Sequence, residues 1–201
     1  SYEEEIPLVA WISFSGPHDT FYAPEEYLSQ VDMAGLPPLI KREGELDGED
    51  RIHHDSYFGG PNSNIDGCGH ADGHACKNYT DEYWDRLRRS YCGNVKLIDD
   101  QVGEIIKAVK AKYGDNALIL FSADHGEMLG DHGLWGKHNC AYDEVWHIPL
   151  LVKYPGQKTG TADRRLVNSV DFLPTCLEAA GAVIPACDGR PLSDPDWERD
   201  Y

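Results

Sequence analysis

The chain has 201 residues and a formal net charge of −17 at pH 7, with 35 Asp and Glu residues against 18 Lys and Arg. This acidic excess argues against nucleic acid or an anionic membrane as a partner, because both require clustered Lys and Arg. Hydrophobic residues make up 41% of the chain, and no apolar run approaches the ~20 residues that span a bilayer. The composition predicts one globular domain, or part of one.

The first residues, Ser1–Glu5, lack the basic and then apolar pattern of a secretory signal, so the sequence predicts no particular compartment. The chain does not begin with Met, and it enters an apolar segment almost at once. We therefore expect that residues originally preceding Ser1 are missing.

That first apolar segment, Leu8–Phe14, has the pattern of a buried strand and is followed by Gly16-Pro17, a turn signal. His18 comes just beyond the expected carboxyl end of the strand. Residues from about 22 to 81 are rich in Gly, Pro, Asn, Asp and charge, without a sustained period. A loop of this length inside a compact domain is typical of functional or disordered segments.

The long loop contains Cys68-Gly69-His70 and His74-Ala75-Cys76, which could form a small metal site. Their spacing matches none of the usual zinc sites, so a disulfide or free thiols is the favoured interpretation. The six cysteines of the chain form no standard disulfide framework. The sequence therefore leaves the redox compartment open.

After the loop, apolar residues recur at steps of three and four and predict an amphipathic helix that ends near Gly114: Leu87, Tyr91, Val95, Ile98, Val102, Ile105, Ile106 and Val109. Two further apolar runs predict strands: Ala117–Phe121 has the pattern of a strand buried on both faces, and His147–Lys153 contains Pro149, which places it near a sheet edge. Residues 169–180 predict a helix that stops at Gly181. This order predicts an α/β fold with a largely parallel central sheet and flanking helices.

Candidate functional residues follow the predicted strand Ala117–Phe121. Asp124 and His125 come at its carboxyl end, where open α/β sheets bind their ligands. A carboxylate and an imidazole can both bind a divalent cation, although two ligands are too few for a tight site. Lys137 lies in a Gly-rich loop shortly after, where its ammonium could contact an oxyanion as a compact point charge.

Six segments in order resemble the sulfatases of the alkaline phosphatase superfamily. They are WISFSGPHDTFYAP (11–24), YCGNVKLIDDQVGEII (91–106), LILFSADHGEML (118–129), GDHGLWGKH (130–138), HIPLLVKYP (147–155) and VDFLPTCLEAAG (170–181). The resemblance covers nearly the whole chain except the loop from about 27 to 81. It implies a single partial sulfatase catalytic domain over residues 1–201, with an alkaline-phosphatase-like fold.

The resemblance also implies roles for four residues. Asp124 and His125 would bind the active-site divalent cation, Lys137 would contact the sulfate group, and His18 would contact sulfate or protonate the leaving oxygen. Calcium is the expected metal, but many sulfatases have Asn where this chain has His125, which leaves manganese and zinc open. His132 is expected to structure its loop, and no role is carried onto His138.

Two elements of the family are not found in the sequence. Sulfatases use a formylglycine made from Cys or Ser in a Cys/Ser-x-Pro-x-Arg motif, and no Cys or Ser of this chain begins that motif. The paired N-terminal aspartates that complete the family's metal site are also missing. We expect this chain alone to be inactive, with formylglycine belonging to a segment not present here.

The sequence therefore predicts part of a hydrolase that acts on a small-molecule or carbohydrate sulfate ester. Two alternatives remain. One is a phosphodiesterase or phosphonate monoester hydrolase of the same superfamily, because Asp-His-Gly and a following Lys serve phosphoryl chemistry equally well. The other is a non-catalytic relative that has kept the fold. The long loop is where substrate choice is expected to be encoded, since loops commonly carry specificity.

Overall fold

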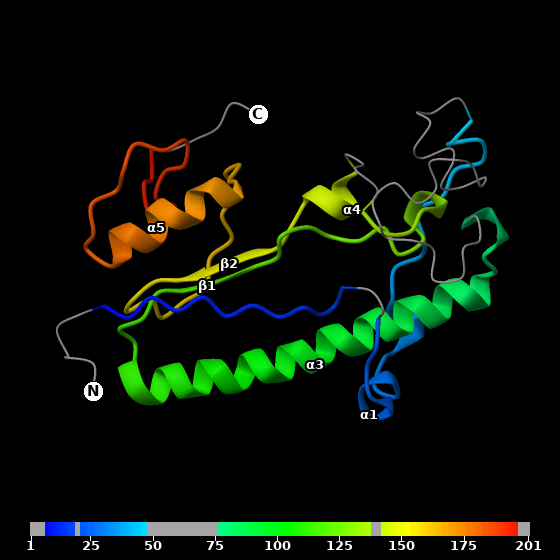
Figure 1. Ribbon diagram of the computed structural model, residues 1–201, viewed down its shortest axis with the longest axis horizontal. Coiled ribbons are helices and arrows are strands. Elements are labelled where there is room, and N and C mark those ends of the chain that lie inside the picture. The colour runs from blue at the N-terminus through cyan, green and yellow to red at the C-terminus, as the bar shows by residue number, and fades with distance from the viewer. Residues whose placement is uncertain (1–6, 19–20, 48–75, 138–141, 197–201) are drawn as a thin grey trace. The chain divides into compact units, whose positions relative to one another are not determined.

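The computed structural model describes residues 7–18, 21–47, 76–137 and 142–196 (Figure 1). The chain divides into two compact units. The first unit consists of Ser1–Ser13, Lys107–Asp124 and Pro149–Tyr201, and the second consists of Phe14–Ile106 and His125–Ile148. Within the described residues, no helix is both long enough and apolar enough to cross a membrane.

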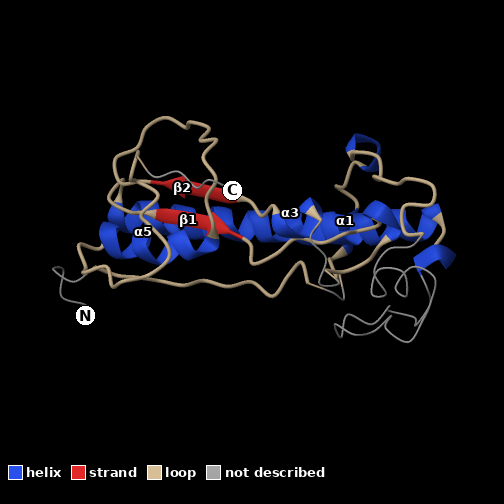
Figure 2. Ribbon diagram, turned by 90° about the horizontal axis from the view of Figure 1, so that it is seen from above, coloured by secondary structure: helices blue, strands red, loops and turns tan. Residues whose placement is uncertain are grey.

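The first unit contains a two-stranded sheet made of β1 (Ile119–Ser122) and β2 (Leu150–Lys153). The two strands run side by side (Figures 1 and 2) and pair antiparallel, with Phe121 opposite Leu151. The Ser122 hydroxyl donates to the Pro149 carbonyl at 2.8 Å, which holds the ends of the pair together. Both predicted strands are confirmed, and β2 begins just after Pro149, as expected for a residue that cannot donate to a ladder.

The predicted parallel sheet is not found among the described residues, because their one strand pairing is antiparallel. The prediction that β1 is buried on both faces is also wrong. Phe121 is 38% exposed and Leu151, its partner in the register, is 63% exposed. A continuous apolar run predicts a strand, but its burial depends on the layers that cover it, and the run itself does not specify those layers.

The prediction of a buried strand over Leu8–Phe14 is also wrong. This segment has no strand pairing, and its apolar side chains are exposed, with Trp11 at 88%. An apolar run becomes a buried strand only where a neighbour supplies the ladder hydrogen bonds. In the described sheet, β1 and β2 pair only with each other.

The predicted C-terminal helix is confirmed as a 3-10 turn, η4 (Ser169–Asp171), that leads into α5 (Phe172–Ala179). Asn168 and Asp171 form a reciprocal capping box, in which each side chain accepts from backbone N–H groups at the helix start. The buried Asp171 carboxylate also accepts from the Arg190 N–H at 3.0 Å, so it ties the following segment to the helix. Gly181 ends the helix with φ +67°.

The predicted amphipathic helix is α3 (Asp81–Tyr113), and it ends at Gly114 as expected. Its residues from 81 to 106 belong to the second unit. Only Trp84, Gly93 and Asn94 are buried along the helix, and Val95 of the predicted stripe is 43% exposed. The 3.6-residue period therefore predicted the helix correctly but not the residues that are most deeply packed.

Among its described residues, the second unit has two small apolar clusters. One contains Leu46, Met128, Leu134 and Val145, and the other contains Cys76, Trp84 and Trp135. Short helices lie between the longer segments: α1 (Glu25–Leu28), η1 (Met33–Gly35), η2 (Cys76–Asn78), η3 (Asp131–Gly133) and α4 (Asp143–Trp146). Three of them fall in the predicted long loop. Of the proposed Cys and His cluster, only Cys76 lies within the described residues, and it is buried.

Candidate functional site

Three of the four predicted site residues come together in the second unit. The Lys137 Nζ lies 3.1 Å from His18 Nε2 and 3.0 Å from His125 Nε2. The two imidazole rings are 6.5 Å apart between centroids, at an angle of 72°. An ammonium has three donors and no acceptor, so both Nε2 atoms accept from Lys137 when it is charged. The cluster therefore joins the Lys137 side chain to the Nε2 atoms of both imidazoles.

His125 has a defined tautomer in this arrangement. Its Nδ1 lies 2.8 Å from the Gly126 carbonyl oxygen, which can only accept a hydrogen bond. The proton is therefore on Nδ1, and Nε2 carries the lone pair. A histidine held by a backbone carbonyl in this way presents Nε2 as a ligand atom.

His18 belongs to a short turn that packs against α3. Its N–H donates to the Ser15 carbonyl at 3.2 Å, which closes the turn. A Cβ on Gly16 would lie 2.8 Å from the side-chain oxygen of buried Asn94, so a larger residue at this position would require the Asn94 side chain to shift. Asn94 thus supports the turn that presents His18, whose own side chain is exposed.

Lys137 follows a loop whose ends are joined by backbone hydrogen bonds. The Met128 N–H donates to the Gly136 carbonyl at 3.1 Å, and the Gly130 N–H donates to the Leu134 carbonyl at 2.9 Å. Met128 and Leu134 are fully buried and anchor the loop in the unit's core. Gly136 has φ +77°, a left-handed conformation that other residues rarely adopt.

The segment after His125 lies directly against α4. The Gly126 N–H donates to the Val145 carbonyl at 2.8 Å, and the Glu127 N–H donates to the Glu144 carbonyl at 3.0 Å. A Cβ on Gly126 would lie only 1.9 Å from that same Glu144 oxygen. The glycine of Asp-His-Gly therefore permits a backbone contact that holds His125 in place.

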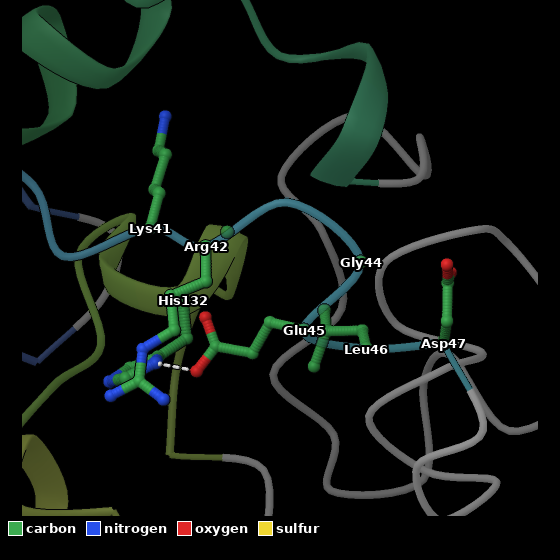
Figure 3. Close-up of a pocket in the computed structure, with 8 residues that line it drawn as sticks. Lys41, Arg42, Gly44, Glu45, Leu46, Asp47 and His132 are labelled. Carbon is green, nitrogen blue, oxygen red and sulfur yellow. Dashed lines mark hydrogen bonds and ion pairs between the residues drawn. The ribbon is translucent and has the colours of Figure 1, made fainter.

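His132 structures the loop, as expected. Its Nδ1 lies 2.5 Å from Glu45 Oε1 and its Nε2 lies 3.5 Å from Glu144 Oε2, while Tyr142 stacks on the ring at 4.1 Å. Figure 3 shows the Glu45 contact at a cavity of about 210 Å³ that is also lined by Lys41 and Arg42. The histidine thus connects the 41–47 segment with the loop before Lys137.

Asp124, the fourth predicted site residue, is the last residue of the Lys107–Asp124 segment of the first unit and is exposed, whereas the other three belong to the second unit. In the part of the chain that the structure describes, no group of three or more His, Cys, Asp and Glu side chains is arranged to hold a metal ion. Among these residues, therefore, no third ligand accompanies Asp124 and His125, the two predicted metal ligands. His138 lies outside the described residues.

Sequence reasoning missed two residues that support the site. Asn94 was missed because the helix was predicted from its apolar residues alone. A polar residue within an apolar stripe indicates a specific contact, and this was the available signal. Glu127 follows the Asp-His-Gly motif directly, and its Oε1 accepts from the Gly136 N–H at 2.6 Å. Its place beside the motif was the only signal, because the contact with Gly136 depends on how the loop folds.

Comparison with known proteins gives consistent results. The sulfatase family model matches residues 2–182. The chain is 32% identical to the "multifunctional alkaline phosphatase superfamily protein PehA" of Trinickia caryophylli over 92% of its own length, and 29% identical to a choline-sulfatase of Rhizobium meliloti over 96%. It covers 37% and 35% of those two proteins, so it spans little more than a third of their length.

Among solved structures, the phosphonate monoester hydrolase of Silicibacter pomeroyi matches with a TM-score of 0.69 and 31% identity, over 90% of this chain and 37% of that one. The corresponding hydrolase of Agrobacterium radiobacter also gives a TM-score of 0.69, at 25% identity, over 92% of this chain and 38% of that one. The chain therefore matches part of the fold of these enzymes, and its described residues contain a two-stranded sheet. From the family match over most of its length, the chain belongs to the sulfatase family of the alkaline phosphatase superfamily.

Proposed function

We propose that this chain is part of an enzyme that hydrolyses sulfate esters, and that Lys137 and His18 contact the sulfate group. The observation that carries the proposal is the Lys137 ammonium held within 3.1 Å of two imidazole Nε2 atoms. A sulfate ester carries negative charge on its non-bridging oxygens. The ammonium and a protonated imidazole are donors suited to bind those oxygens.

The proposed roles require His18 to change from acceptor to donor. Its Nε2 accepts from Lys137 in the described arrangement. An anion that accepts from Lys137 would release this nitrogen, and a proton on Nε2 could then bind a sulfate oxygen or pass to the departing alkoxide. The exposed position of His18 gives a substrate access to it.

Asp124 and His125 are the proposed metal ligands. The carboxylate oxygen and the Nε2 lone pair of His125 fit a divalent cation, with calcium expected and manganese or zinc as alternatives. A metal on Nε2 would require Lys137 to give up its hydrogen bond to that atom. When bound, the ion would supply positive charge at the sulfate oxygens. Further ligands, and the formylglycine nucleophile, would have to come from outside this chain.

Binding of inorganic sulfate to the chain tests the proposal, and isothermal titration calorimetry would measure it. We expect Lys137→Met to weaken binding about tenfold and His18→Gln severalfold, since the first removes a charged hydrogen-bond donor and the second replaces an imidazole that can be protonated with a neutral amide. His147→Gln, which changes an exposed histidine outside the cluster, is the control. Sulfate binding of equal strength in wild type and Lys137→Met would contradict the proposal.

A second candidate function is hydrolysis of phosphonate monoesters. The likeness to two phosphonate monoester hydrolases at TM-scores of 0.69 favours it specifically, and the same cluster could bind a phosphonate. The protein encoded by the complete gene should be assayed with an aryl sulfate and an aryl phosphonate monoester. The substrate with the higher kcat/KM identifies the activity, while no turnover of either would indicate a non-catalytic relative.

A further inference from the structure

We propose that Glu127 is a positioning residue for Lys137. This inference rests on the proposed function, in which Lys137 contacts the anionic group of the substrate. Glu127 acts through the backbone of Gly136, the residue that immediately precedes the lysine.

One oxygen of the Glu127 carboxylate binds both ends of the lysine loop, which consists of residues 127–136 and immediately precedes Lys137. Its Oε1 accepts from the Leu129 N–H at 3.3 Å and from the Gly136 N–H at 2.6 Å. The second distance is short for an N–H···O hydrogen bond. The side chain therefore bridges the start and the end of the loop, and it reinforces the backbone hydrogen bond between Met128 and Gly136.

The Gly136 N–H needs this acceptor. Gly136 is buried, and a buried backbone donor without a partner is unfavourable. Its carbonyl is already used, because it accepts from the Met128 N–H at 3.1 Å. The Gly136 N–H and carbonyl are both hydrogen-bonded, and its φ is +77°, so this peptide has one defined orientation. The orientation of Gly136 in turn sets the direction in which Lys137 leaves the loop.

Glu127 also offsets strain at the other end of the loop. Leu129 has φ 44°, a left-handed conformation that is costly for a residue with a Cβ. Its N–H is the second donor to the Glu127 carboxylate. Loss of the carboxylate would therefore remove one hydrogen bond at each end of the loop, and Lys137 would be held less firmly between His18 and His125.

The test uses the whole chain labelled with ¹⁵N-histidine. The Nε2 chemical shifts of His18 and His125 report the hydrogen bond from Lys137, and Lys137→Met gives the shifts in its absence. We expect Glu127→Ala to move both shifts toward those of Lys137→Met and to weaken sulfate binding about tenfold. Glu127→Gln should keep wild-type values, because its amide oxygen can accept both N–H groups. Glu43→Ala, an exposed loop acid, is the control.

Wild-type Nε2 shifts in Glu127→Ala would overturn the proposal, as would a Glu127→Gln variant that is as impaired as Glu127→Ala. If Glu127→Ala does not fold, Glu127→Asp replaces it, since the shorter side chain cannot reach both N–H groups and should give the same shift changes. The spectroscopic measurement needs no ligand. A wild-type chain that fails to bind sulfate would therefore refute the proposed function and leave the positioning test intact.

Discussion

His132 Nδ1 lies 2.5 Å from Glu45 Oε1, although the two residues are 87 positions apart in the chain. The other ring nitrogen, Nε2, lies 3.5 Å from Glu144 Oε2, so the imidazole has a carboxylate at each of its two nitrogens. Through this one side chain, the 41–47 segment and α4 are attached to the loop that precedes Lys137. Both contacts are shielded, since the His132 side chain is only 10% exposed.

Replacement of His132 should therefore destabilise the second unit. His132→Ala would leave the Glu45 and Glu144 carboxylates without this partner and would remove the ring that stacks on Tyr142. We expect a loss of about 1–3 kcal/mol in the free energy of unfolding, the cost of leaving shielded polar groups unpaired. Urea denaturation would measure it, with the exposed His147→Ala as a matched control. Equal midpoints for both variants would contradict the role of His132.

Two glycine substitutions should have opposite effects. Gly126→Ala would place a Cβ 1.9 Å from the Glu144 carbonyl oxygen, so we expect a loss of about 3 kcal/mol or more in stability. Gly103 lies inside α3, and a Cβ at this position would have no atom within 4 Å. Gly103→Ala should therefore raise stability by about 0.5–1 kcal/mol through helix propensity. Thermal unfolding of the pair would test both, and destabilisation by Gly103→Ala would be the contrary result.

The first unit should lose some stability in acid through Asp163. Hydrogen bonds from Arg165 lower the pKa of this carboxyl to about 2, from 3.8. A lowered pKa in the folded state contributes stability above pH 3.8, and this contribution is lost as pH falls toward 2. Because the Asp163 side chain is 56% exposed, solvent screening limits the effect to about 1 kcal/mol or less.

Asp163→Asn removes the titrating group and should flatten the fall in melting temperature between about pH 4 and 2. Asp188→Asn, at another exposed aspartate of the same unit, is a suitable control. A steeper acid loss in Asp163→Asn than in wild type would be incompatible with the lowered pKa.

The isolated chain should not turn over sulfate esters. It contains no Cys/Ser-x-Pro-x-Arg motif from which a formylglycine could be made. We expect no hydrolysis of an aryl sulfate above that of the Lys137→Met variant, with or without added calcium or manganese. Turnover that disappears in Lys137→Met would show that the chain uses a different nucleophile.

Much of the local structure could be predicted from sequence because its causes are local. The apolar period and the stop at Gly114 predicted α3, and the runs before Ser122 and after Pro149 predicted β1 and β2. Strand pairing and burial depend on partners far away in the chain. For that reason the antiparallel pairing of β1 and β2, and the exposure of Leu8 and Trp11, were not predicted.

In the candidate site, too, some residues could be predicted from the sequence and others could not. The motif resemblance pointed to His18, His125 and Lys137, and the structure brings their nitrogen atoms together. The motif resemblance carried no information on Asn94 or Glu127. The role of each depends on a contact that forms only in the folded chain, Asn94 with Gly16 and Glu127 with the Gly136 N–H. Asp124 remains a predicted metal ligand on the strength of the motif alone.

The loop from Glu127 to Gly136 closes on itself through contacts fewer than ten residues apart along the chain. Segments with such short closures form rapidly during folding, since a loop of about ten residues closes within ~100 ns. The Glu45–His132 contact requires a much longer closure and is entropically more expensive. Among the segments of the site, the loop from Glu127 to Gly136 is therefore the best suited to form early in folding, before the contact between Glu45 and His132 is made.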